Sequence, residues 1–308
     1  GVMTVAALNI TNASGATTLT QNNAVSNLGA VDSTGGNFTL NNKQGGGTAL
    51  TITDTLDATG HNIDIDTGVA AITFSGTPTV TSTNLTLTSS TLTDLNLATL
   101  STSGNLVLKP SVTSSTIGLG DTSTGTFNLV DNEIAKVKSS GATSITIGAS
   151  NGTGVLDIGA PVDLAAKTVT LNSGQINESG DAISAGSLTL NLASSTGANA
   201  VKTTVDSLTA NTTGGTDAVN KGISVDETNA LTLNTINAGT GAVDIDADDN
   251  AITFTANTIT SGDLTLTGST LTDLDLATLA TSGALVAKPK VTSSTIGLGD
   301  TSTGTFNL

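Results

Sequence analysis

The sequence of 308 residues contains no cysteine, tryptophan, tyrosine or arginine, and only four prolines. Without cysteine, disulfide bonds cannot stabilise the fold. The only aromatic residues are five phenylalanines, at positions 38, 74, 127, 254 and 306. Since a compact core normally depends on large aromatic rings for buried area, this chain must fill its interior with Leu, Ile, Val and Ala, in many thin layers.

Basic residues are scarce as well: there are nine, all lysine, and the net charge is −16. Binding to phosphate groups requires a basic surface, so we expect neither nucleic acid nor an anionic membrane surface as a partner. No run of 18 apolar residues is present, and membrane insertion is therefore not expected. The absence of cysteine is compatible with secretion across an outer membrane and equally with a cytosolic location.

Disorder is the first alternative that this composition raises, because Thr, Ser, Gly and Asn are abundant and aromatic residues make up only 2 %. Two observations argue against it. Charged residues make up only 11 % of the chain, and the mean hydropathy is +0.17. The sequence therefore favours a folded chain that is rich in β-branched residues.

A long internal repeat is the strongest signal in the sequence. Residues 84–129 and 263–308 are offset by 179 positions and differ at only seven of them. Weaker matches upstream extend the repeat to about 180 residues. We expect one continuous domain over 1–308, with 1–179 as the first repeat and 180–308 as a partial second one, and Phe74 and Phe127 buried in places equivalent to those of Phe254 and Phe306.

A shorter period lies inside this repeat: a glycine, then an apolar–any–apolar triplet, recurs most often every 21 residues. The glycines of the clearest examples are Gly60, Gly104, Gly125, Gly186 and Gly262. The first apolar positions fall at 38, 63, 85, 106, 127, 145, 169 and 188, and then at 243, 264, 285 and 306. The alternation predicts short strands with one buried face, and the glycine is expected to supply a backbone angle for a turn. We therefore predict an all-β fold, a right-handed parallel β-helix with coils of about 21 residues.

Two other β architectures fit the sequence less well. A string of small β-sandwiches would have strands at a similar spacing, but such domains usually carry a core Trp or Tyr. A left-handed β-helix would show an apolar period of six residues, which is absent. Helical patterns are almost absent too, and only Val130–Val137 could form a turn or two.

Residues 127–158 resemble a motif of large bacterial exoproteins of the filamentous haemagglutinin type. Leu129, Asp131, Glu133 and Ile134 match its first part, and Ile145, Ile147 and Gly148 match its second part. The segment 19–31 also resembles a frequent coil of these proteins. The resemblance implies a right-handed β-helix shaft that is secreted across the outer membrane and that serves adhesion or cell-surface structure.

No catalytic or cofactor site is expected. Carbohydrate-active β-helix enzymes need clustered carboxylates with basic residues and aromatic platforms, and this chain has a single histidine and neither Trp nor Tyr. His61 is expected in a turn, and Ala242 replaces it in the second repeat. A Ser–His pair would depend on that same histidine, so we predict no enzyme.

The best candidate for a metal site is the acidic run Asp244, Asp246, Asp248 and Asp249, since alternate carboxylates suit Ca²⁺. The EF-hand pattern fails, because Asp249 occupies its glycine position and Thr255 its closing glutamate position. Asp244 and Asp246 are expected on the outward face, opposite Val243 and Ile245. A solvated acidic turn is the simpler interpretation, and no metal ligand is predicted.

The sequence thus favours a non-catalytic shaft or spacer of a large secreted or surface-attached bacterial adhesin, outside the cell. The alternative is a self-assembling extracellular fibre or sheath subunit. Its partners are neighbouring repeats or copies of itself, with any receptor bound by parts outside this sequence. We also expect the chain to continue past Leu308 with a segment like 130–179, or to dock there onto another copy.

Overall fold

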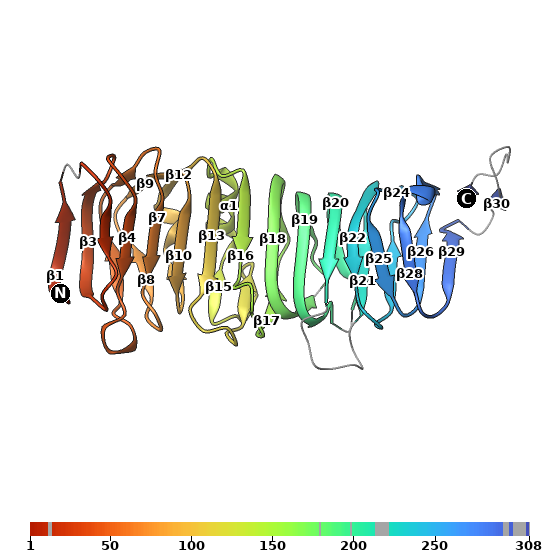
Figure 1. Cartoon of the computed structure of the whole chain (residues 1–308), viewed down its shortest axis with the longest axis horizontal. Coiled ribbons are helices and arrows are strands. Elements are labelled where there is room, and N and C mark those ends of the chain that lie inside the picture. The colour runs from red at the N-terminus through yellow and green to blue at the C-terminus, as the bar shows by residue number, and fades with distance from the viewer. Residues whose placement is uncertain are drawn as a thin grey trace. The chain divides into compact units, whose positions relative to one another are not determined.

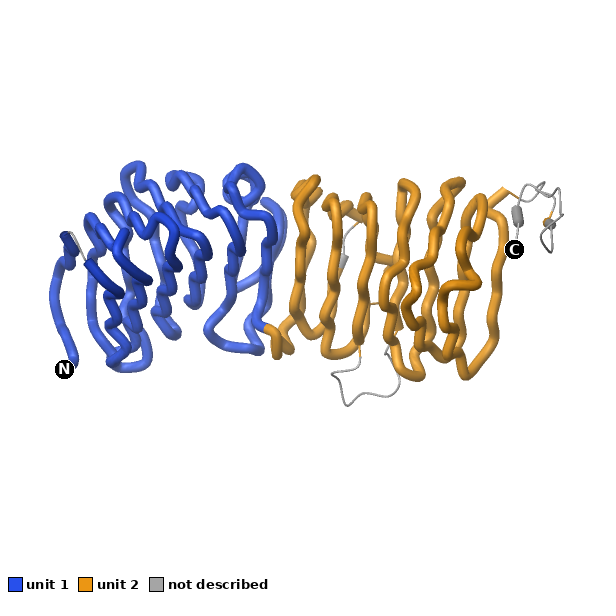
Figure 2. Tube along the Cα trace, turned by 45° about the horizontal axis from the view of Figure 1, so that its top comes forward, with its two compact units in different colours: residues 1–149 blue, residues 150–308 orange. Residues whose placement is uncertain are grey.

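The computed structural model describes residues 1–11, 14–178, 180–197, 199–212, 222–291, 296–297 and 306–307. The chain divides into two compact units, 1–149 and 150–308, which are coloured separately in Figure 2. This division does not coincide with the repeat boundary expected near residue 179, and the single continuous domain over 1–308 stays a prediction. The side chain of Phe306 lies outside the described residues.

Both units are parallel β-solenoids, with about 13 coils in all and roughly 21 residues per coil. Figure 1 shows their short strands stacked side by side in each unit. The predicted parallel β-helix is therefore confirmed. Among the described residues, none of the helices has the length and apolar character needed to cross a membrane.

Unit 1 contains the following elements: β1 (Thr4–Ile10), β2 (Thr17–Leu19), β3 (Ala24–Asp32), β4 (Phe38–Asn41), η1 (Gln44–Gly46), β5 (Leu50–Ile52), β6 (Leu56–Ala58), β7 (Ile63–Asp66), β8 (Ile72–Phe74), β9 (Thr79–Ser82), β10 (Leu85–Ser89), β11 (Leu92–Thr93), η2 (Leu95–Leu97), β12 (Thr99–Thr102), β13 (Asn105–Pro110), β14 (Ile117–Leu119), β15 (Phe127–Leu129), α1 (Asp131–Ser139) and β16 (Ser144–Ile147).

Unit 2 contains the following elements: β17 (Val155–Ile158), β18 (Val162–Glu178), β19 (Ile183–Ser195), β20 (Val201–Asn211), β21 (Ile223–Glu227), β22 (Leu231–Asn237), β23 (Val243–Asp246), β24 (Ala251–Phe254), β25 (Thr258–Ser261), β26 (Leu264–Gly268), β27 (Thr270–Thr272), η3 (Leu274–Leu276), β28 (Thr278–Thr281), β29 (Leu285–Pro289), β30 (Ile296–Gly297) and β31 (Phe306–Asn307).

The coil formed by β7, β8 and β9 illustrates the construction of unit 1. Each of its strands pairs in parallel with the matching strand of the next coil, β10, β11 and β12. The side chains of one face point inward because side chains alternate along a strand. Four aliphatic side chains and one ring of this coil are buried: Ile63, Ile65, Ile72, Val80 and Phe74.

The long repeat is visible in the strand register. Ile63 pairs with Leu85 and Leu85 with Leu106 in unit 1, and Val243 pairs with Leu264 and Leu264 with Leu285 in unit 2. Phe74 pairs with Ile52 and Phe254 with Leu233, which are equivalent places. Phe74, Phe127 and Phe254 are buried, as predicted.

One predicted stacking step is wrong. The spacing placed Phe127 on top of Leu106, but Leu106 pairs with Ile145, and Phe127 pairs with Ile117. The intervening chain leaves the regular coil and forms β14, β15 and α1 before it returns as β16. Sequence spacing alone missed this excursion because Phe127-Asn128-Leu129 has the same alternation as a regular coil strand.

The role expected for the glycines is corrected as well. Gly60 has the predicted positive φ, 80°. Gly104, by contrast, is needed for close approach between coils, since a Cβ there would lie 2.9 Å from the Thr83 carbonyl oxygen and 2.6 Å from Asn84 Oδ1. Gly262 is similar, with a Cβ position 2.4 Å from the Thr240 carbonyl oxygen.

Buried asparagines bind the backbone where coils bend in unit 1. Asn42 is fully buried, and its Oδ1 accepts a hydrogen bond of 2.7 Å from the Val25 amide. Its Nδ2 donates to the carbonyl oxygens of Val25 and Thr48, both at 2.9 Å. A buried polar backbone group without a hydrogen-bond partner costs stability. Asn42 provides that partner for the backbone groups of Val25 and Thr48, so the bend can be buried.

Leu106→Asp is predicted to lower the free energy of unfolding by more than about 3 kcal/mol, because it removes a fully buried side chain and buries a charge without a partner. Denaturant unfolding measures the change. The matched control is Leu285→Asp at the equivalent repeat position, where the side chain is 51 % exposed and less than about 1 kcal/mol is expected. Equal losses in the two variants would contradict the assigned register.

Candidate functional site

The acidic run predicted from the sequence lies in a groove of unit 2, which we call the acidic groove. Its volume is about 400 Å³. It is lined by Ala200, Lys202, Ser224, Val225, Asp226, Thr228, Asp244, Asp246, Asp248 and Lys290. Parallel register places Asp226 beside Asp246 on neighbouring strands, with a like charge on each. As expected, Val243 and Ile245 are buried on the opposite face of β23 while Asp244 is exposed.

Lys290 balances part of this charge. Its Nζ lies 2.7 Å from Asp246 Oδ2 and 3.0 Å from Asp248 Oδ1. These two contacts raise the pKa of Lys290 above its ordinary value. All three side chains are partly exposed, so the ion pairs contribute little to stability, at most about 1 kcal/mol each.

The same carboxylate position binds a lysine in the first repeat. Asp66 forms an ion pair with Lys43, and its Oδ1 accepts a 2.9 Å hydrogen bond from the Gly68 amide. In the second repeat, Asp246 Oδ1 accepts a 3.0 Å bond from the Asp248 amide, with Asp248 in the left-handed region that Gly68 occupies. The two lysines come from different coils, and position 111, which matches Lys290, is a serine.

Asp244, Asp246 and Asp248 thus share one groove, while Asp249 is exposed in the turn beyond it. Of the four carboxylates that line the groove, those of Asp246 and Asp248 contact the Lys290 amine. Within the described ranges, no group of three or more His, Asp or Glu side chains is placed to hold a metal ion. The groove is thus a partly exposed acidic surface with Lys290 as its counter-ion, and the absence of a metal ligand stays a prediction.

His61 lies in the turn between β6 and β7, as expected. Its backbone amide donates to the Ala58 carbonyl oxygen at 2.8 Å, and its own carbonyl oxygen accepts from the Thr83 amide at 2.6 Å. The backbone of this residue therefore joins two successive coils. The expected equivalence with Ala242 is wrong by one residue: Gly241 makes the same two backbone hydrogen bonds in the second repeat, to the Ala238 carbonyl oxygen and from the Gly262 amide. This role therefore does not depend on the imidazole.

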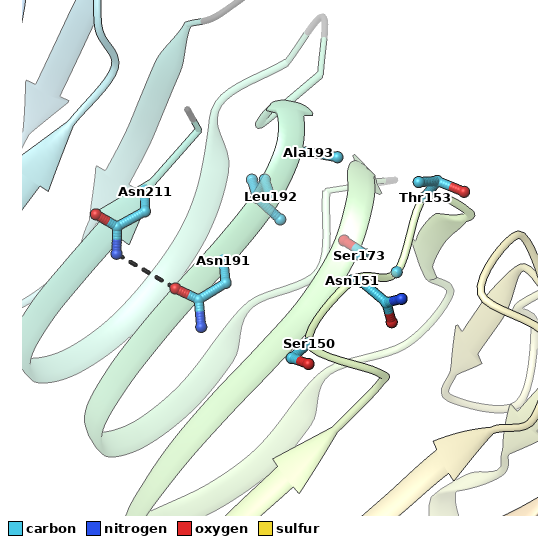
Figure 3. A pocket seen from close by; sticks show the side chains of 9 residues that line it. Ser150, Asn151, Thr153, Ser173, Asn191, Leu192, Ala193 and Asn211 are labelled. Atoms are coloured by element: carbon cyan, nitrogen blue, oxygen red, sulfur yellow. Dashed lines mark hydrogen bonds between the residues drawn. The ribbon is translucent and has the colours of Figure 1, made fainter. Parts of the chain in front are cut away.

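A second groove of unit 2, about 450 Å³ in volume, was not predicted. It is lined by Ser150, Asn151, Gly152, Thr153, Ser173, Asn191, Leu192, Ala193 and Asn211, most of which Figure 3 labels. Asn211 Nδ2 donates to Asn191 Oδ1 at 3.2 Å, and Asn191 Nδ2 donates to Asn172 Oδ1 at 3.0 Å. Asn172, Asn191 and Asn211 share one register position on β18, β19 and β20, and their spacing of 19 and 20 residues was a signal in the sequence. These side chains form hydrogen bonds but supply no acid or base.

Two buried glutamates are the most unusual titratable groups. Glu227 is fully buried on β21, and burial raises its pKa, although hydrogen bonds to its oxygens oppose that rise. Oε2 accepts from Thr203 Oγ1 at 2.8 Å and from the Val205 amide at 3.1 Å, and Oε1 accepts from the Thr228 and Asn229 amides at 2.8 and 3.1 Å. Glu227 thus links β20 of one coil to the turn of the next.

Glu133 acts in the same way in unit 1, where it is 4 % exposed in the first turn of α1. Its Oε1 accepts a 3.0 Å hydrogen bond from the Leu95 amide, and its Oε2 accepts a 3.1 Å bond from the Val130 amide. Burial raises the pKa of Glu133 as well. The sequence analysis named Glu133 as part of a motif but did not single out Glu227. The signal for Glu227 was its position two residues after Val225, which places both side chains on the inner face of β21.

Comparison with known proteins assigns no family: no family model, curated protein or solved structure matches the chain. Its class therefore rests on the structure, a repetitive parallel β-solenoid. Its polar groups make hydrogen bonds and ion pairs between coils in both repeats. The acidic groove differs between the repeats, because Asp66 pairs with Lys43 whereas Asp246 pairs with Lys290, a lysine from a different coil.

Glu227→Gln is predicted to change how stability depends on pH. The native pKa lies above the ordinary value of 4.5, so the native state binds more protons than the unfolded state above that pH. The contribution of Glu227 is thus fully present below pH 4.5 and is lost as the pH rises through the native pKa. The free energy of unfolding of the wild type, minus that of the variant, should therefore fall from pH 4 to pH 7. The size of this fall is set by the size of the pKa shift.

Denaturant unfolding at a series of pH values measures this difference. Asp226→Asn, on the outward side of the same strand, is the control for removing one negative charge. A difference that increases with pH would mean that the hydrogen bonds to Glu227 outweigh its burial and that the assigned direction is wrong.

Proposed function

We propose that the chain is a non-catalytic spacer, part of the shaft of a large secreted or surface-attached bacterial adhesin outside the cell. The observation that carries this proposal is repetition with unchanged register. The blocks 84–129 and 263–308 are nearly identical in sequence. Strand β10 pairs with β13 in the first block as β26 pairs with β29 in the second, position by position. Each added repeat lengthens the solenoid, and length is the main property that a spacer requires.

The differences between the repeats support the same function. Most positions that differ are partly or fully exposed in the first repeat, as at Asn84, Ser101 and Asn105. His61 becomes Gly241, and Ser111 becomes Lys290. The outer surface thus varies while the stacking residues stay apolar. This pattern suits a shaft whose partners are neighbouring repeats, with any receptor bound elsewhere in the protein.

A self-assembling fibre or sheath subunit is the second candidate. The observation in its favour is the parallel pairing of coil with coil through backbone hydrogen bonds, as between β10 and β13. Unpaired strand edges of separate chains associate by the same kind of pairing. The net charge of −16 opposes it through repulsion between copies.

An insertion tests the spacer proposal. A second copy of residues 84–262, placed between Gly262 and Asp263, keeps the repeat in register at both junctions. It adds about eight coils, and at about 4.8 Å per coil the maximum dimension in small-angle X-ray scattering should rise by about 40 Å. The far-UV circular dichroism per residue should stay unchanged.

The control insertion carries the same residues in scrambled order. If the correct insertion increases the maximum dimension no more than a compact domain of the same mass would, the spacer proposal fails. If the scattering of the original chain instead shows particles that grow with protein concentration, the fibre function is favoured.

A further inference from the structure

The turn that leads into β17 contains the only Asn-Gly pair of the sequence, Asn151-Gly152. Asn151 is exposed and Gly152 is partly exposed. Both residues line the second groove of unit 2, and Figure 3 shows Asn151 beside the strands that carry Ser173 and Asn191. Because glycine has no Cβ, its backbone nitrogen meets little hindrance when it approaches the side chain of the preceding asparagine. The pair is therefore a candidate for a reaction between these two groups.

Hydrogen bonding leaves both groups available. Among the residues that the structure describes, neither the Asn151 side chain nor the Gly152 amide has a hydrogen-bond partner. A backbone nitrogen becomes a nucleophile only when it loses its proton, and a hydrogen bond to a protein acceptor would oppose that loss. Close packing begins just beyond the pair: the Gly174 amide donates a 2.7 Å hydrogen bond to the Gly154 carbonyl oxygen, and a Cβ at Gly174 would lie 2.1 Å from the Thr153 carbonyl oxygen.

The one Asn-Ser pair of the sequence, Asn172-Ser173, provides a contrast. Asn172 is 5 % exposed on β18, and its Oδ1 accepts the 3.0 Å hydrogen bond from Asn191. Both residues of this pair are in register with β19. The nitrogen of Ser173 could reach the Asn172 side chain only if the backbone rotated out of the sheet. A small residue thus follows asparagine in both pairs, but only Asn151 is placed to react.

We propose that Asn151 is a site of spontaneous deamidation. The Gly152 nitrogen forms a bond to the side-chain amide carbon of Asn151, and the side-chain nitrogen leaves as ammonia with the proton of the Gly152 amide. Water then opens the five-membered succinimide ring. Attack at the side-chain carbonyl carbon gives aspartate, and attack at the backbone carbonyl carbon gives isoaspartate. In total, water is consumed and ammonia is released. The inference goes beyond the spacer proposal, because the reaction depends on this turn whatever the protein does.

The reaction changes the charge of the second groove. Its described lining consists of Ser, Thr, Asn, Gly, Leu and Ala, all uncharged. Either product adds a carboxylate, which is ionised at neutral pH. Isoaspartate also routes the main chain through the side-chain methylene, which lengthens the turn immediately before the contact between Thr153 and Gly174. The groove is therefore uncharged in newly made protein and becomes anionic as the protein ages.

Incubation of the full chain at neutral and at alkaline pH, followed by tryptic digestion and mass spectrometry, tests this proposal. Trypsin cleaves after lysine, and residues 139–167 contain Asn151 as their only asparagine and no glutamine. The mass of this peptide should rise by the difference between an amide and a carboxyl group. The rise should be faster at alkaline pH and at least about 10-fold faster than at Asn172, which the strand protects. Isoaspartate should form together with aspartate, since direct hydrolysis of the side chain gives aspartate alone.

Two comparisons show whether the turn is responsible. Gly152→Ala should slow the reaction by at least about 10-fold, because a Cβ hinders the approach of the nitrogen, whereas Ser150→Ala on the other side of Asn151 should leave the rate unchanged. A synthetic peptide of residues 139–167 gives the rate without the fold, and the folded chain should react within about 10-fold of it. A folded chain that reacts more slowly than this, an equal rate with Gly152→Ala, or aspartate without isoaspartate would overturn the proposal.

Discussion

The structure depends on one constraint: the apolar face of a coil is buried only by the coils on either side of it. A coil such as Ile63–Ser82 has inward side chains on three strands, and no other layer covers them. Parallel pairing places Ile63, Leu85 and Leu106 in one row, and the same pairing forms the hydrogen bonds of the backbone amides and carbonyl groups. Aliphatic side chains suit this arrangement because each layer is thin, which explains how the chain folds with so few aromatic residues.

Polar side chains are buried where this regular stacking is interrupted. Asn42 binds the backbone at a bend, Glu227 joins a strand to the turn of the next coil, and Glu133 fastens the only α-helix of the described residues to the coil below it. In each case a side chain accepts hydrogen bonds from amides that the strand ladder leaves free. These residues determine where the solenoid can bend or add a helix.

Most of the fold could be predicted from the sequence, because alternation and a repeat of known length fix which residues point inward. Phe74 and Phe254 were assigned to equivalent buried places on this basis, and Val243 and Ile245 to the inner face of β23. Local pattern could not predict the excursion between β13 and β16, since Phe127-Asn128-Leu129 resembles any other coil strand. It also could not reveal Lys290 beside Asp246, a contact that spans two coils and depends on the direction of one flexible side chain.

The central claim is that a coil is an interchangeable unit defined by register, and deleting one coil tests it most directly. Removal of residues 63–84 puts Leu85 in the place of Ile63, Leu92 in that of Ile72 and Leu100 in that of Val80. The account predicts that this variant keeps the circular dichroism per residue and the cooperative unfolding of the original chain, whereas removal of residues 63–73 alone, half a coil, disrupts both. Loss of structure in the full-coil deletion, or equal tolerance of the half-coil deletion, would contradict it.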